Sequence, residues 1–129
     1  MLIDRHEPED VFARVPELAG QTGPRYVLIK GGHAPGDPVD ILFDGHAFRE
    51  YSGERIATSS THGTGCTLSA AIAAYLARGL TVEDAIGRAK EYVAAAMRAA
   101  NPIGCGHGPL HHLFALPEDS SLRRQSSLR

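Results

Sequence analysis

The stretch THGTGCTLSAAIAAYLARG, residues 61–79, carries the strongest structural signal in the sequence. It opens with a glycine-rich loop, and residues 66–78 then form an apolar, alanine-rich run. Gly79 is typical of the position just after a helix C-terminus. The larger apolar residues recur at the spacing of one helix face: Leu68, Ile72, Tyr75 and Leu76. The stretch therefore predicts a loop that leads directly into a helix over residues 66–78.

A second helix is predicted immediately after the first. Thr81 is placed to cap it, and the acidic Glu83 and Asp84 in its first turn favour the helix dipole. We expect this helix to extend to about residue 100, because the pair Asn101-Pro102 ends it. Alanine-rich faces let both helices pack closely against each other or against a sheet. The expected buried stripe is Ala85, Ile86, Ala89, Val93 and Met97.

Three short strands are predicted ahead of the glycine-rich loop. Residues 25–30 (RYVLIK) form an apolar, β-branched run that is typical of a buried strand. Residues 39–44 and 47–52 form a predicted hairpin, with Asp44-Gly45 at its turn. A further strand around residues 55–57 is an open alternative to irregular structure. Together with the helices, these strands predict an α/β fold with a small sheet and packed helices.

The two ends of the chain are less regular. Residues 8–19 have apolar positions at helical spacing, and Pro16 is expected to end or kink that helix. Residues 115–129 finish in SSLRRQSSLR, which predicts a disordered tail. A basic arm for an anionic partner is the alternative interpretation of this tail.

Composition excludes several classes of protein. The 129 residues are 43% hydrophobic and 22% charged, which is typical of one globular domain and not of a disordered chain, a collagen or a disulfide scaffold. A net charge of −2 indicates no broad basic surface, so no nucleic-acid partner is expected. No apolar run is long enough to cross a membrane, and the acidic start is unlike a signal peptide. Cys66 and Cys105 are expected to be free thiols in a reducing cytoplasm.

The loop at residues 61–65 has the features of an anion site. Gly63 and Gly65 carry no Cβ, so the backbone can approach a bound group closely. The first amides of the following helix have no partner inside the helix, and with the helix dipole they favour a negative charge. A phosphate is the expected ligand, and an ordinary glycine-rich turn is the alternative.

Cys66 falls in the first turn of the predicted helix, where the dipole favours a thiolate. Such a group is suited to accept the proton of a hydroxyl that attacks a phosphoryl group. The alternative for Cys66 is a small buried hydrophobic side chain. Lys30 ends a predicted strand, at the sheet edge where ligands of α/β proteins gather, and it suits either a phosphate or a plain surface position.

A metal site is the weakest of the candidate sites. His107, His111 and His112 come closest to ligand spacing, but Gly108-Pro109 forbids a helix between them. No carboxylate or cysteine completes an obvious set, so we predict no metal site. Packing within the loop, or contact with a phosphate, is the expected role of these histidines.

Five segments occur in an order that carries a resemblance to a known family: IKGGH (29–33), DILFDG (40–45), THGTGCTLSAAIAAYLARG (61–79), AKEYV (89–93) and GHGPLHHLF (106–114). Together they closely resemble the C-terminal half of hydroxymethylpyrimidine/phosphomethylpyrimidine kinase, a thiamine-biosynthesis enzyme of the ribokinase-like superfamily. The resemblance covers residues 25–114, inside a predicted domain at residues 1–114. It implies the C-terminal part of a three-layer α/β/α fold whose central sheet is mostly parallel.

The resemblance also implies a reaction. ATP, accompanied by Mg²⁺, would phosphorylate the hydroxymethyl group of 4-amino-5-hydroxymethyl-2-methylpyrimidine and then the resulting monophosphate. Cys66 matches the catalytic base, and Lys30 and Thr61 match the nucleotide side of the site. The anion hole around the transferring phosphoryl group matches the backbone of Gly63, Thr64, Gly65 and Cys66.

The chain departs from this family at its front. The family enzyme is much longer than this chain. In the family, a further segment precedes the strand whose last residue matches Lys30, and we expect residues 1–24 to contain no counterpart of that segment. Most of the pyrimidine pocket belongs to the N-terminal half of the family enzyme. Without that half, an edge strand of the sheet is expected to be exposed. We therefore expect self-association or a complementing subunit. The alternative functions are a non-catalytic fragment or assembly module, and a pyridoxal kinase-like enzyme, which the cysteine of THGTGC disfavours.

Overall fold

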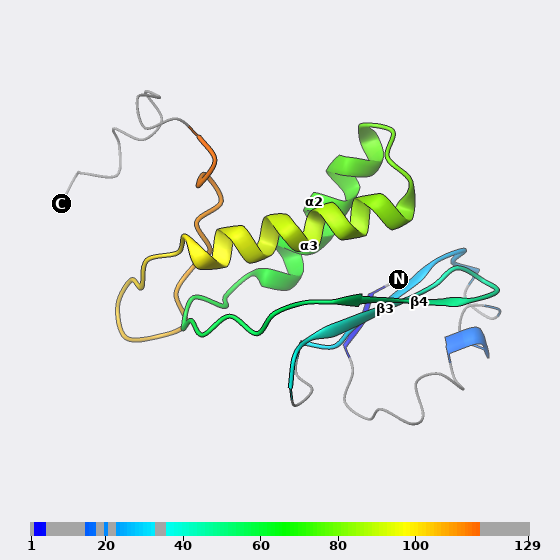
Figure 1. The fold of residues 1–129 in the computed structure, drawn as a ribbon, viewed down its shortest axis with the longest axis horizontal. Coiled ribbons are helices and arrows are strands. Elements are labelled where there is room, and N and C mark those ends of the chain that lie inside the picture. Colours follow the sequence, from blue (N-terminus) through cyan, green and yellow to red (C-terminus); the bar gives the residue numbers. More distant parts are fainter. Residues whose placement is uncertain (1, 5–14, 18–19, 21–22, 33–35, 117–129) are drawn as a thin grey trace. The chain divides into compact units, whose positions relative to one another are not determined.

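The computed structural model describes residues 2–4, 15–17, 20, 23–32 and 36–116. The chain divides into two compact units, Met1–Arg55 and Ile56–Arg129. The first unit contains a sheet and the second contains the two long helices (Figure 1). The predicted tail lies almost entirely outside the described residues. Each unit is described below by itself.

The sheet of the first unit has four strands in the order β1-β2-β3-β4. The last two strands form the predicted hairpin, and β1, which the sequence did not predict, pairs in parallel with β2. The pairs β2–β3 and β3–β4 are antiparallel, so this part of the sheet is mixed. The three predicted strands are confirmed with ends moved by one or two residues. The bounds are Leu2–Asp4 for β1, Val27–Lys30 for β2, Val39–Phe43 for β3 and Phe48–Ser52 for β4.

Alternating apolar residues build the core of this unit. One face of β2 and β3 packs with Val15, because side chains at every second position of a strand point to the same face. The strand β4 is mostly exposed, and its Phe48 ring lies 4.8 Å from the ring of Phe43. The core residues are Val15, Val27, Ile29, Ile41 and Phe43.

The predicted hairpin turn is confirmed in detail. Gly45 has a φ of 100°, a left-handed conformation that glycine adopts without strain. The Asp44 carboxylate accepts hydrogen bonds of 2.8 Å from the amides of His46 and Ala47. These bonds lower the pKa of Asp44 below its usual 3.8, the Ala47 amide contributing most. The side chain of Asp44 thus closes the turn by binding its own backbone.

The second unit contains two helices that pack side by side, α2 (Thr64–Ala77) and α3 (Val82–Arg98) (Figure 1). The helix α2 ends as predicted: Gly79 has a φ of 89°, its amide donates to Leu76 and the Leu80 amide donates to Tyr75. In the described part of the chain no helix is both long and apolar enough to cross a bilayer.

The expected buried stripes are only partly right. In α2, Leu68 is buried, but Leu76 is 39% exposed. In α3 the expected Ala85, Ile86 and Ala89 are buried, whereas Val93 and Met97 are half-buried and Ala96 is buried instead. The difference has a packing cause, because Ala96 lies under the 110–114 segment, whose His111 amide donates to its carbonyl at 3.2 Å.

Two other expectations concern residues 55–57 and 8–19. The alternative strand around residues 55–57 is wrong, because these residues have no strand conformation. The Arg55 amide donates instead to the Asp37 carboxylate at 3.3 Å, and its guanidinium binds the carbonyl of Gly36 at 2.7 Å. Of the predicted helix at residues 8–19, residues 15–17 are helical and the rest lies outside the described residues.

Candidate functional site

The loop before α2 reaches the helix through a left-handed glycine. Gly63 is the N-cap residue, with φ 83° and ψ 5°. Its carbonyl accepts hydrogen bonds from the amide of Thr67 at 2.9 Å and from the hydroxyl of the same residue at 2.8 Å. Four predicted site residues, Gly63, Thr64, Gly65 and Cys66, are therefore consecutive at the N-terminus of α2, which begins two residues earlier than expected.

The backbone amides at this N-terminus have no capping side chain as a hydrogen-bond acceptor. Gly63 has no side chain with which to cap them, and no acidic residue lies in the first turn. Thr64 donates to the carbonyl of Thr61 at 3.4 Å, but within the described ranges the amides of Gly65 and Cys66 donate to no other residue. Unpaired amides at the positive end of a helix dipole are suited to bind an anion.

The neighbouring helix α3 shows the opposite arrangement. The Thr81 hydroxyl accepts a hydrogen bond of 3.2 Å from the Asp84 amide, and the first turn contains Glu83 and Asp84. Their carboxylates offset the positive end of the dipole. Of these two helix N-termini, only that of α2 lacks both a capping side chain and an acidic residue in its first turn.

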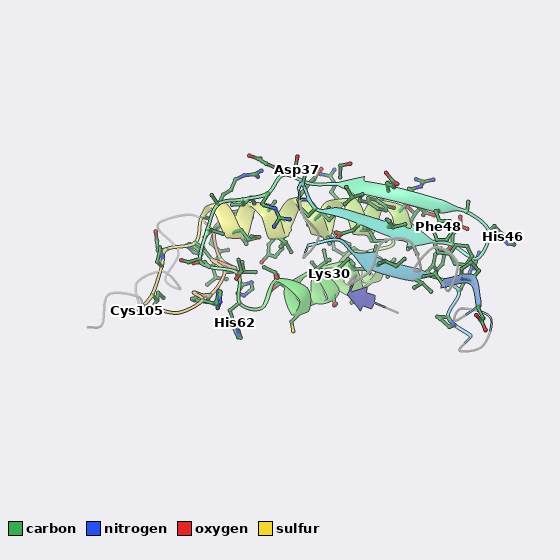
Figure 2. The ribbon with its side chains drawn as sticks, turned by 90° about the horizontal axis from the view of Figure 1, so that it is seen from below. Lys30, Asp37, His46, Phe48, His62 and Cys105 are labelled. Carbon is green, nitrogen blue, oxygen red and sulfur yellow. The ribbon has the colours of Figure 1, made fainter. Side chains whose placement is uncertain are left out.

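Thr61 lies in the same loop as these amides. Its hydroxyl oxygen is 3.3 Å from Nδ1 of His107, and its amide donates to Ser59 at 3.0 Å. Figure 2 shows the adjacent His62 on the loop that leads into α2, and Cys105 on the loop that follows α3. The structure thus brings Thr61 together with the four residues of the predicted anion site.

Cys66 is an exposed, free thiol, so its alternative interpretation as a buried hydrophobic side chain is wrong. It lies at one end of an open groove of about 600 Å³ that follows one face of α2. The residues Ala70, Ala74 and Arg78 continue this face at four-residue spacing. Other lining residues are Thr67, Ala71, Tyr75, Tyr92 and His112.

The sequence did not identify Tyr92 and His112 as lining residues of the groove that includes Cys66. Tyr92 comes from α3, and its hydroxyl donates to the backbone carbonyl of His112 at 2.8 Å. Its ring also lies 5.5 Å from the ring of Phe114. Helical spacing from Cys66 was the available signal for the α2 residues of the groove. No local signal marked Tyr92 or His112, because they approach through the fold.

Lys30 belongs to the other unit, where it is the last residue of β2 and is half-buried (Figure 2). The turn after it is closely constrained. The buried amide of Gly31 donates to Asp40 Oδ1 at 2.9 Å. Arg55 binds the carbonyl of Gly32 at 3.5 Å. The position of Lys30 at the end of a strand is therefore as predicted, and its part in binding a nucleotide stays a prediction.

The histidines that the structure describes do not form a metal cluster. Across the described residues, no group of three or more histidine, cysteine, aspartate or glutamate side chains is placed to hold a metal ion. His107 instead contacts Thr61, and the backbone of His111 and His112 is bound by α3. These residues serve the packing of loops against a helix.

Solved structures with a similar fold are kinases. Bacillus subtilis pyridoxal kinase, solved with ADP, is 32% identical with a TM-score of 0.77, covering 88% of this chain and 47% of that one. Phosphomethylpyrimidine kinase from Clostridium difficile is 34% identical with a TM-score of 0.54, covering 72% and 40%. The fold is thus that of the ribokinase-like α/β kinases.

The sequence defines the family within this class. Residues 2–111 match the phosphomethylpyrimidine kinase family, so the match includes residues 2–24, for which no counterpart was expected. A thiamine biosynthesis bifunctional protein of Geobacter sulfurreducens is 56% identical over 72% of this chain and 19% of its own length. A hydroxymethylpyrimidine/phosphomethylpyrimidine kinase of Streptomyces coelicolor is 50% identical over 74% of this chain and 36% of its own length. The chain belongs to the phosphomethylpyrimidine kinase family, and it spans less than half the length of these relatives.

Proposed function

We propose that this chain carries the anion-binding and proton-accepting part of an ATP-dependent kinase in thiamine biosynthesis. Its substrate would be 4-amino-5-hydroxymethyl-2-methylpyrimidine or the monophosphate of that compound. One observation carries the proposal: the unpaired amides of Gly65 and Cys66 lie at an uncapped helix N-terminus, beside an exposed thiol. This juxtaposition fits a phosphoryl group and the hydroxyl that attacks it.

The proposed reaction is an in-line phosphoryl transfer. ATP supplies the phosphoryl group when bound. The sulfur of Cys66 accepts the proton of the substrate hydroxymethyl group as its oxygen forms the new bond to phosphorus. The bond to the ADP oxygen breaks, and ADP leaves with the electron pair. The amides of residues 63–66 stabilise the charge on the transferring group, which is the main task of a protein in this chemistry.

The nucleotide side of the site is assigned to two residues. Thr61 is proposed as one contact because it lies in the loop beside the anion site, and Lys30 as the other because it ends a strand before a glycine turn. Mg²⁺ is proposed only as the companion of the nucleotide phosphates, because the described side chains do not fit a metal site of their own. Both cysteines are free and exposed, which supports a reducing cytoplasm.

The groove along α2 supports the proposal of a polypeptide partner. The helix has no charged residue in its 14 residues, yet Leu68 is its one buried residue. A helix that is apolar on every side is normally covered on every side. Since longer relatives contain more of the kinase fold, we propose that the groove is covered by a polypeptide that supplies that remaining part.

The proposed kinase activity is tested by ATP consumption on adding hydroxymethylpyrimidine. We expect Cys66→Ala to reduce kcat by about 10²-fold to 10⁴-fold, the usual contribution of a general base. The matched control is Cys105→Ala, which removes the other exposed thiol and is expected to leave kcat unchanged. Equal turnover by wild type and Cys66→Ala would contradict the role of the thiol.

The same assay separates the alternative functions. Faster turnover of pyridoxal than of hydroxymethylpyrimidine would favour a pyridoxal kinase, which the similarity to the Bacillus subtilis enzyme keeps as the second candidate. No turnover of either substrate, together with no binding of ATP, would indicate a non-catalytic assembly module. Light scattering would then test the partner proposal. A stable monomer that does not bind a polypeptide with the remaining part of the kinase fold would contradict it.

A further inference from the structure

The loop before α2 is braced by a segment far from it in the sequence. The His62 amide donates to the carbonyl of Gly108 at 3.2 Å, and the Gly108 amide donates to the carbonyl of Ser59 at 3.1 Å. His62 and Pro109 also form an isolated parallel bridge. Residues 59–62 and 107–109 therefore pair as two short extended segments, which we name the brace.

The two halves of the brace approach each other very closely. Ser60 is fully buried, and in the described part of the chain its hydroxyl has no hydrogen-bond partner. A Cβ on Gly108 would lie 2.6 Å from that hydroxyl oxygen, so a larger residue at 108 would require the Ser60 side chain to move. This close packing fixes the backbone at the point where the loop turns toward α2.

One pair of side chains adds to these backbone contacts. Thr61 Oγ1 and His107 Nδ1 are 3.3 Å apart, across 46 residues of sequence. The contact is compatible with both neutral tautomers of the imidazole, because a hydroxyl can donate or accept. Thr61 also accepts the amide of Thr64 through its carbonyl at 3.4 Å. His107 is thus connected through Thr61 to the first residue of α2.

This connection matters because no side chain caps the amides at the N-terminus of α2. Its N-cap is a glycine, and the nearby hydroxyl of Thr67 donates to the Gly63 carbonyl and not to the loop that precedes it. We infer that His107 is a positioning residue of the anion site: through Thr61 it holds the loop whose amides face the ligand. The nature of that ligand rests on the proposed function, whereas the positioning role rests on the brace.

Three substitutions at residue 107 distinguish a positioning role of His107 from a direct charge interaction of its imidazole with the anion. His107→Asn places a polar atom where Nδ1 stands, whereas His107→Gln places one where Nε2 stands, and His107→Ala removes both. Titration calorimetry with Mg·ATP on the full chain is expected to show Kd raised about fivefold in the Ala and Gln variants, the value of one hydrogen bond, and nearly unchanged in the Asn variant. The control is His46→Ala, an exposed histidine in the β3–β4 turn.

A double-mutant cycle tests the route through Thr61. Thr61→Val removes the hydroxyl with little change in shape, so adding His107→Ala to it is expected to raise Kd no further. Independent, multiplied effects of the two substitutions would overturn the inference, as would equal losses in the Asn and Ala variants. The second outcome would mean that the imidazole acts on the anion by its own charge.

Amide hydrogen exchange decides the inference even if ATP does not bind. The amides of His62 and Gly108, which make the brace bonds, are expected to exchange at least about tenfold faster in His107→Ala and His107→Gln than in wild type or His107→Asn. Unchanged exchange in His107→Ala would overturn the positioning role. Failure of wild type to bind ATP would contradict the proposed function and leave this result valid.

Discussion

The carboxylate of Asp40 accepts a 2.9 Å hydrogen bond from the buried amide of Gly31, joining the second residue of β3 to the turn after β2. This bond satisfies an amide that has no place in the β2–β3 ladder, whose register ends at Ile29 and Ile41. The turn begins directly after Lys30. The bond therefore determines how the chain leaves the strand that carries a proposed nucleotide contact.

Replacing Asp40 should show the value of this bond. Asp40→Ala leaves the Gly31 amide buried without an acceptor, so we expect the free energy of unfolding to fall by about 1–3 kcal/mol. Asp40→Asn keeps an acceptor oxygen and loses only the charge, so its loss should be about half as large. Denaturant unfolding measures both, and equal losses in the two variants would show that the hydrogen bond is not the cause.

Gly31 should not tolerate a side chain. A Cβ at this residue would overlap the carbonyl of Val39, and backbone atoms cannot move aside as a flexible side chain can. We expect Gly31→Ala to lower the free energy of unfolding by about 3 kcal/mol, at the upper end for overpacking. Gly32→Ala is the matched control, because nothing lies within 4 Å of its added Cβ. Similar thermal unfolding of the two variants would refute the steric explanation.

The turn at Asp44 should make stability depend on acid pH. Backbone hydrogen bonds from Ala47 and His46 lower the folded-state pKa of Asp44 below the 3.8 of the unfolded chain. The stabilisation is therefore complete above that pH and is lost as the pH falls through the folded pKa. Thermal unfolding between pH 5 and about 2 should show a smaller acid-induced loss in Asp44→Asn, which keeps the acceptor but does not titrate. Identical pH profiles for wild type and variant would contradict this.

The N-cap of α3 should contribute to the free energy of unfolding although Thr81 is exposed. Thr81→Ala removes the hydroxyl that accepts the Asp84 amide, and we expect a loss of about 1 kcal/mol in the free energy of unfolding. Thr81→Ser retains the acceptor and should leave the free energy of unfolding nearly unchanged, because serine is at least as good an N-cap as threonine. Urea denaturation followed by circular dichroism compares the three proteins. A serine variant as unstable as the alanine variant would exclude the cap as the cause.

Local sequence predicted most elements because their signals act over a few residues. An apolar, β-branched run located β2, and Asp44-Gly45 between two strand-like segments located the β3–β4 hairpin and its turn. Gly79 and Thr81 marked the end of α2 and the start of α3 correctly. The strand β1 was missed, because three residues are too few to show a period and their partner is distant in sequence.

The candidate site also has features that local sequence predicted and features that it did not. The glycine loop, the helix start and the position of Cys66 follow from neighbouring residues, so THGTGC was sufficient to place them at the N-terminus of α2. The catalytic role of Cys66 stays a prediction. Val93 and Met97 were expected in the buried stripe, but helical spacing alone does not reveal which side of α3 the 110–114 segment covers.

The amino-acid sequence was enough to establish the family, the secondary structure around the loop and the chemistry of an uncapped helix N-terminus. Those properties depend on backbone geometry and on residues within one or two helical turns. The pairing of Thr61 with His107, the fit of Gly108 against Ser60 and the approach of Tyr92 to the Cys66 groove required the folded chain. Each joins segments whose separation along the chain carries no local signal, and only close packing brings them within bonding distance.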